Sequence, residues 1–119
     1  MANEITVNSS IYASKNGATL SQSSSKTIDM SGDQMLANIQ IVGTAAEAIV
    51  LGDVSTIGYL MLKNTDSTNY VEIAGEVGIT NFVQKILAGE FILLKPEVAT
   101  IYAKANTAAV NLLVVALEL

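Results

Sequence analysis

The stretch AVNLLVVALEL, residues 109–119, has large apolar side chains on both sides of an extended chain. Because side chains in a strand alternate with a period of two, the two sides are Val110, Leu112 and Val114, and Leu113, Val115 and Leu117. In a two-layer sandwich, one side of a strand meets the core and the other usually meets water. A second apolar side needs a cover, so these six residues are the candidate interface of a closed homo-oligomer.

Other short segments also alternate with the period of a strand. In MLANIQIVG, Met35, Ala37, Ile39 and Ile41 share one side, whereas Asn38 and Gln40 share the other, which predicts a half-buried strand. NYVEIAG and TIYAKAN alternate in the same way. Along the whole chain, short apolar runs between turn signals predict eight to ten short strands, spaced about 8–12 residues apart. This spacing predicts an all-β, antiparallel β-sandwich, which we expect to be jelly-roll-like.

We expect a single domain over residues 1–119, with residues 1–26 as a looser N-terminal segment. These 26 residues hold many serines and few large apolar side chains, so little burial offsets the entropy of ordering them. Asn16-Gly17 favours a type I′ hairpin turn, because both central residues of that turn need a positive φ. The segment SQSSSK, residues 21–26, is compatible with a loop or with an exposed edge strand.

Two segments are ambiguous between helix and strand. TAAEAIVLGD has the spacing of a helix capping box at Thr44 and Glu47, but Gly52 ends it early and Ile49-Val50 is β-branched, which favours a strand. ITNFVQKILAGEF fits a short helix beginning at Asn81, or two strands joined by a turn at 88–90.

The composition excludes several classes of function. The net charge is −5, and the six basic residues are all Lys and are scattered, so we expect no nucleic-acid binding. Cys and His are both absent, which removes disulfides, thiolate and imidazole metal sites and the Ser–His–Asp arrangement. We expect no signal peptide, because MANEITVNSS lacks basic and apolar regions, and no membrane span, because the longest apolar run is LLVVAL.

The polar stretch KNTDSTNY, residues 63–70, is first a turn between two apolar runs, because Asn, Asp, Ser and Thr bond to their own backbone. The alternative is a Ca²⁺ loop that uses Asn64, Asp66, Asn69 and Glu72. Calcium takes six to eight oxygen ligands, usually from several carboxylates, and this loop holds one. We therefore expect a turn, no metal and no cofactor.

Three stretches of the sequence together carry a family resemblance: GYLMLKNTDSTNYVEI, a later GE turn in LAGEFILLKP, and YAKANTAA before the apolar C-terminal strand. On these motifs, about residues 27–119 of the chain resemble a group of small structural proteins of tailed bacteriophages. The resemblance implies a non-enzymatic virion component, assembled in the host cytoplasm, that decorates or stabilises the capsid. The implied partners are other virion proteins, such as the major capsid protein, and copies of the chain itself, with a trimer favoured. It supplies no catalytic residues.

Two alternatives to a structural role remain open. A glycosidase would need paired carboxylates, and Glu72 and Glu76 are the nearest pair, with Gly75 suggesting a bend between them. A phage adhesin on head or tail would bind host glycans through exposed aromatic rings. The candidate rings are Tyr12, Tyr59, Tyr70 and Tyr102, of which Tyr70 and Tyr102 lie opposite core-facing positions.

Overall fold

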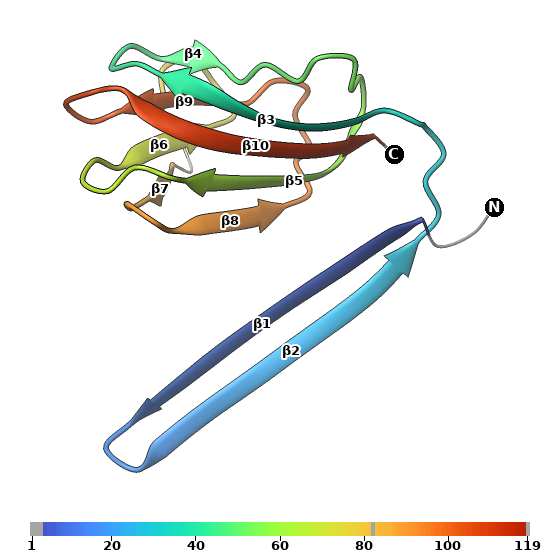
Figure 1. Cartoon of the computed structure of the whole chain (residues 1–119), viewed down its shortest axis with the longest axis vertical. Helices are drawn as coiled ribbons and strands as arrows, with labels where there is room; N and C mark the ends of the chain where they lie inside the picture. Colours follow the sequence, from blue (N-terminus) through green and yellow to red (C-terminus); the bar gives the residue numbers. More distant parts are fainter. Residues whose placement is uncertain (1–3, 82, 119) are drawn as a thin grey trace. The chain divides into compact units, whose positions relative to one another are not determined.

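The protein is described by a computed structural model that covers residues 4–81 and 83–118. Within these residues the chain is all-β, with ten strands and no helix, and therefore no helix that could cross a bilayer (Figure 1). The strands are β1 (Ile5–Lys15), β2 (Ala18–Ile28), β3 (Met35–Val42), β4 (Glu47–Ala48), β5 (Ile57–Asn64), β6 (Val71–Ala74), β7 (Gln84–Ile86), β8 (Phe91–Leu94), β9 (Tyr102–Ala105) and β10 (Val110–Glu118). All paired strands are antiparallel, so the predicted all-β antiparallel class is confirmed.

The chain divides into two compact units, one within residues 1–32 and the other within residues 33–119. The first contains the β1–β2 hairpin, whose strands pair without interruption from Ile5 opposite Ile28 to Lys15 opposite Ala18. Its turn residues have positive φ angles, 53° at Asn16 and 82° at Gly17, which confirms the predicted Asn-Gly turn. The serine-rich segment 21–26 lies in β2 and is therefore a strand rather than a loop.

The hairpin is expected to open more readily than the strands of the second unit. All residues from 8 to 27 are exposed, and a two-stranded hairpin without a buried face has little independent stability in water. In the purified protein, amide hydrogens of β1 and β2 should therefore exchange faster than those of β10, as measured by hydrogen–deuterium exchange with mass spectrometry. Equal protection of β1 and β10 in a monomeric sample would contradict this expectation.

The second unit is a β-sandwich of two four-stranded sheets. One sheet, here called the β10 sheet, has the strand order β3-β10-β5-β8; the other, the β6 sheet, has the order β4-β9-β6-β7. Figure 1 shows the two sheets as layers, with the long strand β10 (red) between β3 and β5. Strands β8 and β7 form one side edge of the two sheets, and β3 and β4 form the other.

The core lies between the sheets and is made of aliphatic side chains from both. The β10 sheet contributes Leu60, Leu62, Val110, Leu112, Val114 and Ala116, and the β6 sheet contributes Val71, Ile73, Ile86, Ala103 and Ala105. The predicted alternation of β6 and β9 is confirmed, because Val71, Ile73, Ala103 and Ala105 are buried while Glu72 and Lys104 are half-buried on the opposite side.

Strand β3 alternates as predicted, but its apolar side faces away from the core. Leu36 and Val42 point inward, whereas Met35, Ile39 and Ile41 are 69%, 55% and 68% exposed. The inward side also holds Gln40, whose amide donates to the Glu47 carboxylate (3.1 Å) and to the Ala48 carbonyl (3.1 Å). Partners at the sheet edge therefore accept the hydrogen bonds of the Gln40 amide on the inner side of β3. The apolar side chains of Met35, Ile39 and Ile41 lie on the outer side of the strand.

Neither ambiguous segment is helical within the described residues: the first contains a strand of two residues, and the second contains two strands joined by a turn. Glu47 does not cap a helix; its carboxylate accepts from the Gly43 backbone N–H (3.1 Å) and from Gln40, and β4 is only the two residues Glu47–Ala48. In the second segment, β7 and β8 are joined by a turn in which Gly89 has φ 80° and the Glu90 N–H donates to the Leu87 carbonyl (2.9 Å). Strand–turn–strand is therefore the correct alternative for residues 84–94.

Candidate interaction surfaces

The outer face of the β10 sheet is a continuous apolar surface. Paired residues form rows across the strands: Ile41–Asn111, Ile39–Leu113–Lys63–Phe91, Ala37–Val115–Met61–Leu93, and Met35–Leu117–Tyr59. Lys63 carries the one charge in these rows, and Lys63 and Asn111 both lie toward the end where β10 begins. We call this set of rows the apolar face.

The most exposed side chains of the apolar face lie on the edge strands. Phe91 is 65% exposed and Leu93 40% exposed on β8, which matches the exposure of Met35, Ile39 and Ile41 on β3. On the central strands, Leu113, Val115, Tyr59 and Met61 are half-buried by their neighbours. Apolar residues on the surface of a protein are usually scattered singly. A contiguous apolar area of this extent therefore indicates a binding surface.

The outer face of the β6 sheet has the opposite character. Glu72 lies between Lys104 on β9 and Lys85 on β7, so opposite charges face each other across the strands. The Lys85 ammonium also lies 4.4 Å from the centre of the Tyr70 ring. Charged side chains of this kind are well solvated, so this face can remain exposed to water. The two outer faces of the sandwich therefore differ: one is charged and the other is apolar.

The structure divides the six candidate interface residues into two groups. Val110, Leu112 and Val114 are at most 1% exposed and pack in the core of the chain itself. Leu113, Val115 and Leu117 are half-buried on the apolar face. Only the second group remains available for contact with another molecule.

Sequence reasoning missed the contribution of the edge strands, namely Met35, Ile39, Ile41, Phe91 and Leu93. The signal was present in MLANIQIVG, but alternation does not say which side of a strand faces the core. Leu36 and Val42, on the polar side of this strand, are the residues that could have indicated the correct orientation.

A groove of about 830 Å³ opens between the sheets on the side of β7 and β8. Its apolar lining includes Ile73, Ile92 and Leu94, and Glu76, Lys95 and Glu97 contribute charged side chains. Next to it, the Lys95 ammonium lies 5.9 Å from the centre of the Tyr59 ring.

The KNTDSTNY stretch is a turn held by its own side chains. The Asp66 carboxylate accepts from the backbone N–H groups of Thr68 (2.9 Å) and Asn69 (2.6 Å), and the Asn64 side-chain oxygen accepts from the Asp66 N–H (2.9 Å). The Asn64 amide donates to the carbonyls of Asn69 (2.8 Å) and Ile86 (3.0 Å). Of the four residues in the calcium alternative, Asn64 and Asp66 therefore use their side-chain oxygens to accept from backbone N–H groups, and the prediction of a turn is confirmed.

These hydrogen bonds predict a dependence of stability on pH. The N–H groups of Asn69 and Thr68 lower the pKa of Asp66 below its ordinary value of 3.8, because they stabilise the charged carboxylate. A lowered pKa gives stability that is present above the unfolded-state pKa and is lost as the pH falls through the folded-state pKa. We therefore expect Asp66→Asn to destabilise the protein at neutral pH, and this loss to shrink as the pH falls below the ordinary pKa of 3.8 and through the lowered folded-state pKa.

Urea unfolding of both proteins across this pH range measures the difference. Ser67→Ala, which leaves the carboxylate in place, is the control and should show the same loss at every pH. A loss for Asp66→Asn that stays constant with pH would contradict the expectation.

Glu72 and Glu76 have different neighbours in the structure. Glu72 faces Lys104 and Lys85, as described above, whereas the Glu76 carboxylate accepts from the backbone N–H groups of Thr80 (2.6 Å) and Asn81 (3.0 Å). The N–H of Asn81, and then that of Thr80, lowers the pKa of Glu76, which keeps this carboxyl charged rather than ready to donate a proton. Residues 4–81 and 83–118 contain no cluster of three or more acidic residues placed to hold a metal ion.

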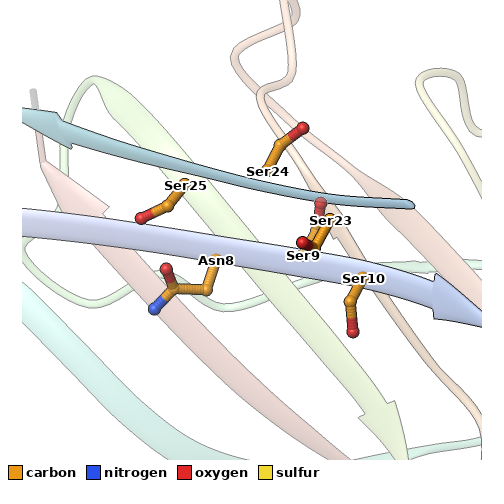
Figure 2. A pocket seen from close by; sticks show the side chains of 6 residues that line it. All are labelled: Asn8, Ser9, Ser10, Ser23, Ser24 and Ser25. Carbon is orange, nitrogen blue, oxygen red and sulfur yellow. The ribbon is translucent and has the colours of Figure 1, made fainter. Parts of the chain in front are cut away.

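The hairpin carries a second, polar surface. Asn8, Ser10, Ser23 and Ser25 share one of its faces, and with Ser9 and Ser24 they line a hollow of about 430 Å³ (Figure 2). Figure 2 shows the side chains of Asn8 and Ser10 on the same side of β1. Tyr12 follows on this face and is 68% exposed, whereas Tyr59, Tyr70 and Tyr102 are half-buried.

Searches of protein-family models, of curated proteins and of solved structures find no match to this chain.

Proposed function

We propose that the protein is a non-enzymatic structural component of a tailed-bacteriophage virion that decorates or stabilises the capsid. One observation supports this role above the others: the β-sandwich has one charged outer face and one apolar outer face. A surface of this kind is suited to being covered in an assembly, because burying it removes apolar area from water at the cost of few polar groups. The resemblance of residues 27–119 to phage structural proteins is the reason for proposing a virion as this assembly.

The strand order supports a jelly-roll topology for the sandwich. Successive strands from β3 to β10 alternate between the two sheets, except that β6 and β7 are neighbours in one sheet. Sheets of order β3-β10-β5-β8 and β4-β9-β6-β7 are those expected when eight strands fold as two Greek keys, as in viral capsid proteins. The fold alone does not define the role, so the topology supports the proposal by analogy.

The proposed partners are copies of the chain itself and the major capsid protein. We favour a trimer, since capsid-associated proteins often occupy three-fold positions. The proposed location is the assembled particle, formed in the host cytoplasm.

Cryo-electron microscopy of intact particles tests the function directly. Particles produced from the genome that encodes this chain should show density for the β-sandwich on the head, and mass spectrometry of purified particles should detect the chain in many copies. Absence of the chain from purified, infectious particles would overturn the proposal.

An adhesin is the second candidate, and the polar face of the hairpin favours it. Tyr12 offers an exposed ring beside the small polar side chains of Asn8 and Ser10, which resembles a platform with hydrogen-bonding groups for a sugar. Binding of the purified protein to a glycan array, lost in Tyr12→Ala but kept in Ile11→Ala on the opposite face, would support this function. Absence of binding to host cells and to host-derived glycans would reject it.

A further inference from the structure

We propose that the apolar face of the β10 sheet is covered by the same face of other copies of this chain. The inference rests on the proposed function as an assembling protein, and it names the partner of one surface. It differs from the interface expected from the sequence, because it uses all four strands of the sheet and leaves the inner side of β10 in the core.

The exposed side chains of the apolar face lie close enough together to be covered by one partner surface. Its five most exposed large apolar side chains lie between 40% and 69% exposed, and the half-buried side chains of β5 and β10 fill the middle. Contact with a second apolar surface therefore removes the side chains of all four strands from water together.

The chemistry of two other described surfaces, the outer face of the β6 sheet and the polar face of the hairpin, favours the apolar face as its own partner. The outer face of the β6 sheet would bring Glu72, Lys85 and Lys104 against apolar side chains, and these charges would lose water without gaining partners. The hairpin face with Asn8 and Ser10 would bury hydroxyl and amide groups in the same way. A second apolar face gives mutual burial. Lys63 and Asn111 lie toward one end of the rows, and Lys95 lies 5.9 Å from the Tyr59 ring in the row at the other end, so these polar groups can reach water.

Two sheets can pack in this way because sheet faces interdigitate at a separation of about 10 Å. Closure with two copies places the sheets face to face, and closure with three places the faces around a common axis. Both arrangements bury the same rows, and both are closed, so neither leaves an apolar face open to further association.

The test uses the purified full-length chain in size-exclusion chromatography with light scattering. We expect two or three times the mass of one chain, and a two- to threefold lower mass for Val115→Lys and for Ile39→Lys, with the far-ultraviolet circular dichroism of the parent. Ile39 is already 55% exposed in the single chain, so its substitution should not disturb folding even if Val115→Lys does. The matched control is Val77→Lys, at a residue 61% exposed outside this face, which should keep the parent mass.

A monomeric parent protein at high concentration would overturn the inference, and so would a folded Ile39→Lys variant that keeps the parent mass. The two proposals fail separately. A monomer that is nevertheless found on particles rejects this interface and keeps the virion function, whereas an oligomer that is absent from particles does the reverse.

Discussion

Asn64→Asp is expected to destabilise the β-sandwich by about 4 kcal/mol, because it places a carboxylate where an amide donates two hydrogen bonds. Asn64 is fully buried, and its amide nitrogen lies 2.8 Å from the Asn69 carbonyl oxygen and 3.0 Å from the Ile86 carbonyl oxygen. An ionised Asp would direct a negative oxygen at these two carbonyl oxygens, in place of the amide N–H groups that now donate to them. Since small domains are stable by roughly 5–15 kcal/mol, a large part of the population should unfold.

Urea unfolding at neutral pH measures this loss, and Asn106→Asp is its control. Asn106 is exposed, so the same change of charge there should alter the free energy of unfolding by less than about 0.5 kcal/mol. A second signature follows from the site. Burial should raise the pKa of the new carboxyl, so the loss in Asn64→Asp should shrink as the pH falls and the group becomes protonated. A loss below about 1 kcal/mol at neutral pH would show that Asn64 does not hold the turn.

Asn64 also illustrates what could be predicted from the sequence. The turn at 64–70 was predictable because Asn and Asp bond to a backbone only a few residues away, as Asp66 does with Thr68 and Asn69. The Asn16-Gly17 turn was predictable for the same local reason, since its positive φ angles depend on these two residues alone. The second role of Asn64, its bond to the Ile86 carbonyl, joins residues 22 positions apart and leaves no local pattern.

The apolar face could not be predicted in full, because its rows are formed by strands that are distant in sequence. Ile39, Leu113 and Phe91 become members of one row only when β3, β10 and β8 join the same sheet. Alternation of side chains shows that a strand has two different sides. It does not show which side faces the core when the sheet also has an apolar outer face. This explains why Met35, Ile39 and Ile41 were not recognised as surface residues.

Leu112→Ala is expected to cost about 3 kcal/mol of unfolding free energy, and it separates the two apolar sides of β10. Leu112 is fully buried among aliphatic side chains of both sheets, so truncation leaves a cavity in addition to the lost burial. Leu113, the next residue, is half-buried on the apolar face, so Leu113→Ala should cost at most about 1 kcal/mol within one chain. Urea unfolding at two protein concentrations distinguishes them: the loss at Leu112 should be the same at both, whereas the loss at Leu113 should grow with concentration, because association stabilises the parent more. Equal losses at the two positions, both independent of concentration, would contradict the assignment of Leu112 to the core and Leu113 to the covered surface.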